Sequence, residues 1–136
     1  MKNIKQLKEN FAGKPEAGLL ICTIDGENSK NLTSFYQNIA TDLFFPEHFG
    51  ANLDAFYDML CDLTWLEDKG IEKLHIVVRN YDSLLAEEDN EQKLGVLSVI
   101  RDSAEEWYWL EKEESFLDFG VFVEPSKTFK KDLKEI

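Results

Sequence analysis

Three aspartates at steps of four residues, Asp54, Asp58 and Asp62, are the side chains whose type and spacing could do chemistry in this chain. On a helix they would stack along one face, where neighbouring carboxylates could act as acid and base or could bind positive charge. His48 precedes them and adds a group that titrates near neutral pH. Like charges at this spacing destabilise an isolated helix by about 0.2–0.5 kcal/mol per pair. The row is therefore either a solvated face of an acidic protein or a surface that meets positive charge elsewhere.

Catalysis would require more than these carboxylates. A general base needs a tuned pKa and a substrate pocket, and the sequence has no phosphate-binding loop, nucleophile elbow or metal triad. Its cysteines and histidines, at positions 22, 48, 61 and 75, do not have the spacing of metal ligands. We therefore expect a protein that is not an enzyme and that uses no metal and no cofactor.

A helix that begins near residue 52 must position the aspartates. Asn52 is suited to cap its first turn, because its side-chain oxygen can accept a hydrogen bond from an otherwise unpaired backbone N–H. Leu53, Phe56, Leu60 and Leu63 then recur at spacings of three and four, which gives the helix one apolar face. The aspartates lie on another face, so the sequence predicts that they are exposed while the leucines and the phenylalanine are buried.

This stretch resembles the barstar family of ribonuclease inhibitors. The family pattern is a proline–acid–aromatic–aromatic–glycine turn followed by Asn-Leu-Asp-Ala-aromatic-aromatic-Asp. It is matched here by PEHFG at residues 46–50 and by NLDAFYD at residues 52–58. The resemblance runs from Asp25 to about Asp62 and continues more loosely from Val96 to Glu106.

The resemblance implies an inhibitor whose acidic helix face occupies the phosphate-binding sites of a basic ribonuclease. Asp58 matches the family's dominant carboxylate, and Asp54 matches its neighbour one turn earlier. His48 stands in place of a stacking aromatic residue, Tyr57 stands where the family often has Trp, and Asp102 stands where a glutamate makes a peripheral ion pair. The implied partner-binding set is completed by Phe49, Gly50, Asn52, Asp62 and Val99. An alternative is a barstar-like adaptor whose partner is a basic protein other than a ribonuclease.

The composition limits the classes of protein to consider. The chain has 136 residues, a formal net charge of −12 and 43% hydrophobic residues, which fits one folded domain that repels nucleic acid and anionic lipid. It shows no basic patch of the kind that nucleic-acid binders carry. It also has no secretion signal and no apolar stretch long enough to span a membrane. We therefore expect a cytoplasmic protein that is monomeric when free and binds neither nucleic acid nor membranes.

Strands that alternate with helices indicate the fold class. Apolar runs predict strands at 19–24, 73–78 and 119–123, and helical periods predict helices from Thr33 to Leu43, from residue 52 to 63 and from about 90 to 112. Such alternation is typical of an α/β fold, here a three-stranded parallel sheet packed by helices, as in barstar-like proteins. We expect one domain over 1–136. Residues 1–18 would form an appended polar helix or arm, 64–72 a long link, and 126–136 a loose arm or a peripheral helix.

Overall fold

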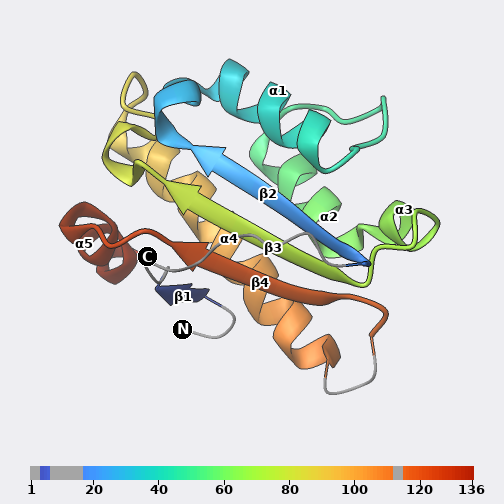
Figure 1. The fold of residues 1–136 in the computed structure, drawn as a ribbon. Helices are drawn as coiled ribbons and strands as arrows, with labels where there is room; N and C mark the ends of the chain where they lie inside the picture. Colours follow the sequence, from blue (N-terminus) through green and yellow to red (C-terminus); the bar gives the residue numbers. More distant parts are fainter. Residues whose placement is uncertain (1–3, 7–16, 112–114) are drawn as a thin grey trace.

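A parallel β-sheet forms the centre of the fold (Figure 1). The structure is a computed structural model that describes residues 4–6, 17–111 and 115–136. Within these residues the sheet has four strands in the order β1-β4-β3-β2, and every neighbouring pair is parallel. The strands are β1 (Ile4–Gln6), β2 (Leu19–Asp25), β3 (Lys73–Arg79) and β4 (Asp118–Val123). The chain is therefore an α/β protein with a parallel sheet.

The three predicted strands are confirmed to within one residue at each end, and the structure adds a fourth. In the register of the sheet, Cys22 lies opposite Ile76, and Ile76 lies opposite Val121. The expectation of a polar helix or arm for residues 1–18 is wrong at residues 4–6, which pair with β4 as strand β1. Residues 7–16 of that segment lie outside the described part of the chain.

The helices α1 (Leu32–Asp42), α2 (Leu53–Asp62) and α4 (Asn90–Glu111) cover one side of this sheet. In Figure 1, α2 and α4 lie behind the strands and α1 lies along β2. Side chains from the sheet and these helices form one core, whose largest fully buried members include Phe35, Phe56, Leu60, Leu74 and Phe119. The helical segments are η1 (Gly26–Asn28), α1 (Leu32–Asp42), α2 (Leu53–Asp62), α3 (Thr64–Glu67), η2 (Tyr81–Ser83), α4 (Asn90–Glu111) and α5 (Lys127–Glu135).

The start of α1 differs from the prediction. The predicted helix begins at Thr33, whereas α1 begins at Leu32 and is capped by Asn31, whose side-chain oxygen accepts a hydrogen bond of 2.9 Å from the Ser34 backbone N–H. Asn31 has the extended backbone (φ −131°, ψ 165°) that a cap requires. Asn and Thr are both good caps, so side-chain type alone does not choose between positions two residues apart.

The link between α2 and β3 contains a short helix. The segment 64–72, expected only as a long connection, forms α3 and then a turn at Gly70, where φ is 75°. Trp65 in α3 donates a hydrogen bond of 2.8 Å from its indole N–H to the Leu43 carbonyl at the end of α1. The link therefore packs against the first helix.

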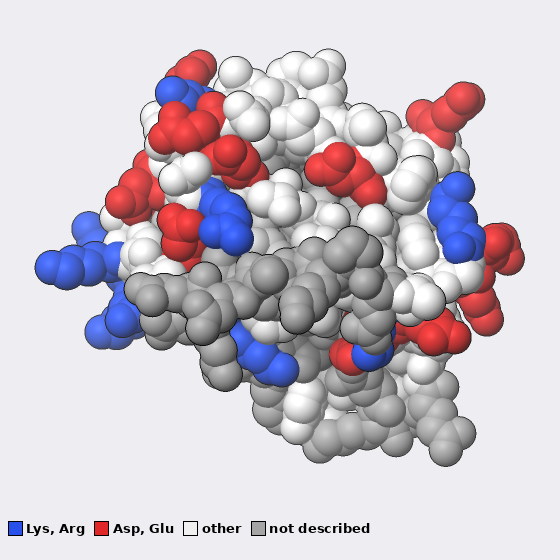
Figure 2. All heavy atoms as spheres, in the orientation of Figure 1, with Lys and Arg blue, Asp and Glu red and all other residues white. Residues whose placement is uncertain are grey.

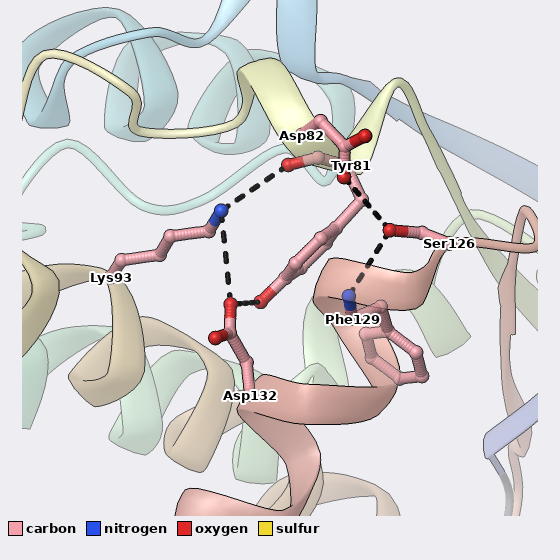
Figure 3. Close-up of polar contacts among 6 residues, drawn as sticks. All are labelled: Tyr81, Asp82, Lys93, Ser126, Phe129 and Asp132. Atoms are coloured by element: carbon pink, nitrogen blue, oxygen red, sulfur yellow. Dashed lines mark hydrogen bonds and ion pairs between the residues drawn. The ribbon is translucent and has the colours of Figure 1, made fainter.

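The C-terminal segment forms a helix and not a loose arm, so the second of the two expectations for it is confirmed. Ser126 caps α5, because its hydroxyl oxygen accepts a hydrogen bond of 3.1 Å from the Phe129 backbone N–H (Figure 3). The same hydroxyl donates to Asp82 at 2.9 Å, which links the start of α5 to η2. The Phe129 ring then packs edge-on against the Tyr81 ring at 5.2 Å.

A buried polar group fixes the middle of α5. The Tyr81 hydroxyl donates to the Asp132 carboxylate at 2.8 Å, and the Lys93 ammonium lies 3.8 Å from the same oxygen (Figure 3). Lys93 also lies 4.3 Å from the centre of the Tyr81 ring. Three elements, η2, α4 and α5, thus meet at one carboxylate.

Candidate partner-binding site

The turn before α2 is built on packed aromatic rings. The Phe49 backbone N–H donates to the Pro46 carbonyl at 3.0 Å, and the Phe49 ring packs edge-on against Tyr36 at 5.7 Å and against Phe45 at 5.0 Å. Phe49 is half-buried, so it anchors this turn, whereas His48 and Gly50 on either side of it are exposed.

Asn52 is the N-cap of α2, as predicted. Its side-chain oxygen accepts a hydrogen bond of 2.8 Å from the Ala55 backbone N–H, and its own backbone is extended. The expected apolar face is buried at Phe56, Leu60 and Leu63, each with an exposed fraction of 0%, and Leu53 is half-buried. The cap and this face together fix which way the aspartates of α2 point.

The three aspartates of α2 are exposed but not equivalent. Asp62 accepts hydrogen bonds from the hydroxyl and the backbone N–H of Thr64, at 2.8 and 3.3 Å, and so stabilises the junction between α2 and α3. The side chains of Asp54 and Asp58 make no hydrogen bond or ion pair with another described residue. Their carboxylates are free to bind an external cation, and the row of three predicted from spacing has two free members.

The face of α4 that packs against α2 is formed by residues spaced four apart in the sequence. Gly95, Val99, Ser103 and Trp107 follow one another along α4. An added Cβ at Gly95 would lie 2.8 Å from a methyl carbon of Leu53. Ser103 is in hydrogen-bond contact with the Cys61 thiol at 3.8 Å, and the buried Trp107 indole donates to the Leu60 carbonyl at 2.6 Å.

Gly95 therefore has a packing role. A glycine inside a helix costs about 1 kcal/mol relative to Ala, so its presence here needs a structural reason. The structure shows that this glycine lets Leu53, at the start of α2, approach the backbone of α4. Val99, predicted as a contact residue, is half-buried between Gly95 and Ser103 in the same row.

Tyr57 lies where the acidic surfaces of the two helices meet. Its pKa is raised to about 12, first by a hydrogen bond with the Cys61 thiol, and also by the negative charges of Glu106 and Asp102 on α4. These α4 carboxylates are exposed, as is Asp58 on α2, one residue after Tyr57. Asp102 also forms an ion pair of 2.9 Å with the neighbouring Arg101.

We call Asp54, Asp58, Asp102 and Glu106, grouped around Tyr57, the acidic surface. Of these, Glu106 was missed from the sequence, although it lies four residues after Asp102 and so shares its helix face. The Cys61 thiol next to Tyr57 has its pKa raised, mainly by burial, so it remains protonated at neutral pH. The surface can bind positive charge, but it has no nucleophile with a lowered pKa.

The structure thus brings most of the predicted residues to the adjoining faces of α2 and α4. Asp54, Tyr57, Asp58, Val99 and Asp102 lie there, while His48 and Gly50 lie on the turn that leads into α2. Three of the predicted residues also make stabilising contacts within the protein, namely Phe49, Asn52 and Asp62. Among the residues described, no group of three or more His, Cys, Asp or Glu could hold a metal ion, and no helix is long and apolar enough to cross a bilayer.

Comparison with models of known protein families identifies the family of this chain. The family model described as Barstar (barnase inhibitor) matches residues 19–124, which is most of the chain. The chain belongs to the barstar family. The match begins at β2 and ends one residue after β4, so the strand β1 and the helix α5 lie outside it. Members of the barstar family are inhibitors and not enzymes, and they bind a protein partner. No curated protein matches the chain.

Proposed function

We propose that this protein inhibits a basic ribonuclease by placing its acidic surface in the enzyme's active site. The observation that carries this proposal is the state of Asp54 and Asp58. Both are exposed, both lie on a helix fixed by its cap and by α4, and neither pairs with another described residue. Structural aspartates usually have an internal partner, as Asp62 and Asp132 do here.

The physical basis is mimicry of phosphate. A ribonuclease active site must hold the anionic backbone of RNA and therefore presents Arg, Lys or His. An aspartate that enters such a site forms charge-assisted hydrogen bonds about twice as strong as neutral ones. Asp102 and Glu106 would add negative potential at the rim, where charge mainly increases the rate of association.

The chain's departures from the family pattern bear on the partner. His48 replaces an aromatic residue that stacks at the active site, and it is exposed on the turn before α2. An imidazole is smaller than the aromatic ring that it replaces, so a stacking contact made by His48 would differ from the one that the family makes there. We expect the partner to differ from barnase where it meets this turn.

A capture experiment tests the function. The wild-type protein and Asp58→Ala are immobilised and exposed to lysate and culture medium of the source cells, and each captured protein is assayed for RNA hydrolysis with and without added free protein. We expect the wild type, but not Asp58→Ala, to capture a basic ribonuclease that the free protein inhibits. Capture of a basic protein without ribonuclease activity would overturn the inhibitor assignment in favour of an adaptor. Equal capture by both baits would place the binding site elsewhere.

A further inference from the structure

A groove runs along α1 beside the acidic surface, and the proposed function does not use it. One hollow of about 350 Å³ lies between α1 and the turn before α2. A second hollow of about 500 Å³ lies between the start of α2 and the start of α4. Leu32, Tyr36 and Ala51 line both, so the two hollows form one continuous groove. Its size is in the range of pockets that hold a ligand group.

The groove contains a polar atom that lacks a partner. Tyr36 is only 6% exposed, and its ring packs edge-on against Phe49 at 5.7 Å and Phe56 at 5.8 Å. Its hydroxyl makes no hydrogen bond with any other described residue, and its oxygen is not among the fully enclosed atoms. Hydroxyls of buried tyrosines usually have a partner. In this groove the partner would have to be solvent or a bound molecule.

The groove is continuous with the acidic surface but differs from it in chemistry. Its second hollow is lined by Asp54 and by the cap residue Asn52. Along α1, in contrast, Asp42 is the one charged residue, and the surface at the top of Figure 2, over α1, is almost free of charged side chains. A molecule that binds the acidic surface through its positive charge would therefore meet an apolar groove next to Asp54.

We propose that this groove receives an aromatic side chain of the basic partner that binds the acidic surface. The identity of the partner rests on the proposed function, but the chemistry of the groove does not. An incoming ring would pack edge-on against Tyr36 and Phe49 and would extend the edge-on contacts that these rings already make. The Tyr36 hydroxyl would form a hydrogen bond with a polar group of the partner next to that ring. Aromatic residues are enriched in protein–protein interfaces.

A small aromatic probe tests the groove without any partner. Titration with 4-ethylphenol is followed through the backbone amide signals by NMR. We expect saturable shifts at Thr33, Gln37, Ala40 and Ala51. They should be lost in Gln37→Trp, where the new ring fills the groove from its exposed rim. The matched control is Thr41→Trp, which is exposed on the same helix but does not line the groove. No saturable shift, or the same shifts in Gln37→Trp, would overturn the proposal.

Titration calorimetry with the captured basic protein tests the partner contact. We expect Gln37→Trp to weaken binding at least about tenfold and Tyr36→Phe to weaken it about two- to tenfold, since only one hydroxyl is lost. Thr41→Trp should bind like the wild type. If Gln37→Trp binds like the wild type while Asp58→Ala does not, the groove proposal is wrong and the proposed function stands. If Asp58→Ala binds like the wild type, the proposed function fails, and the probe titration still decides the groove.

Discussion

Asp58 and Asp102 carry the same charge but have different surroundings. The Asp58 carboxylate is exposed and makes no hydrogen bond or ion pair with a described residue, whereas the Asp102 carboxylate is already paired with Arg101. We expect Asp58→Ala to weaken partner binding by at least about 2 kcal/mol, a hot-spot threshold drawn from interface surveys that include barstar itself. Asp102→Ala should cost about 1 kcal/mol or less, because exposed ion pairs contribute little. Titration calorimetry measures both variants.

Thermal melts of the same two variants provide the control. Neither side chain is buried, so the stability of each variant should stay within about 0.5 kcal/mol of the wild type. Asp58→Ala can gain slightly, because it removes a like charge from the row. Equal affinity of Asp58→Ala and the wild type, in folded protein, would show that Asp58 lies outside the interface.

Gly26 marks a close approach of two backbones at the carboxyl end of β2. It is buried, and an added Cβ would collide with the Asn80 carbonyl and would lie 2.7 Å from the Leu84 backbone nitrogen. We expect Gly26→Ala to destabilise the protein by about 3 kcal/mol, the upper end of overpacking costs, because backbone atoms and not side chains must move. Gly50→Ala is the matched control, since its nearest neighbour would be a side-chain atom at 3.4 Å. Urea denaturation that gives equal midpoints for the two variants would contradict this account.

Single residues show what the sequence could and could not reveal about the site. Asn52 could be identified as a cap because its role depends on local geometry alone. Asp58 could be placed on an exposed face by helical spacing. The packing of Leu53 on Gly95 and the charge of Glu106 beside Tyr57 depend on how α2 meets α4. No spacing within one helix encodes how the two helices meet, so the contact between Leu53 and Gly95 and the position of Glu106 beside Tyr57 were missed.

Among the elements, α5 depends on one buried carboxylate. Asp132 is 6% exposed, and it accepts a hydrogen bond from Tyr81 and pairs with Lys93. We expect Asp132→Ala to destabilise the protein by about 3 kcal/mol, the lower end for breaking a buried pair, because Lys93 keeps its contact with the Tyr81 ring. Urea denaturation measures this loss.

A double variant distinguishes an unpaired charge from lost packing. In Asp132→Leu combined with Lys93→Met, both charges are replaced by apolar groups, so no buried charge remains. We expect this variant to recover most of the stability lost in Asp132→Ala. If it is as unstable as the single variant, packing and not the unpaired ammonium is the cause.

From the buried Tyr81 hydroxyl and its hydrogen bond to Asp132, we predict how the stability of the protein changes at alkaline pH. The pKa of Tyr81 is raised above its ordinary value of 10, first by burial and then by its hydrogen bond to Asp132. The folded protein therefore keeps the Tyr81 proton at a pH where the unfolded chain loses it. This contribution to stability is fully present below pH 10 and is lost as the pH rises above it. Urea midpoints from pH 8 to 11 should fall above pH 10, and they should fall less in Tyr81→Phe.

The helices and strands differ in how reliably their sequences predict them. The strands β2, β3 and β4 are apolar runs of six or seven residues, so their type and near-exact bounds could be predicted. The strand β1 has three residues, Ile-Lys-Gln, which is too short for any period. Its pairing with β4 depends on a partner at the other end of the chain. For the segment that forms α5, the sequence left two alternatives, a loose arm or a peripheral helix. It could not decide between them, because the helix is held by contacts with η2 and α4.

At the scale of the whole molecule, charge should govern the rate of encounter with the partner. The chain has a formal net charge of −12, and Asp54, Asp58, Asp102 and Glu106 gather part of it on one surface. We expect the association rate constant for a basic partner to fall about tenfold or more as salt is raised from low to high ionic strength. The dissociation rate should change much less. Stopped-flow measurements over a salt series test this, and a salt-independent association rate would exclude electrostatic steering.

The strand β1 also has a consequence for the order in which the molecule assembles. Ile4 pairs with Val121, so two segments that are far apart in the sequence become neighbours in one sheet. Loops this long close late, because their entropy cost is met only after nearer contacts have formed. During synthesis β4 emerges from the ribosome long after β1, and until then β1 lacks the described strand with which it pairs. The first strand of the chain should therefore be the last to enter the sheet.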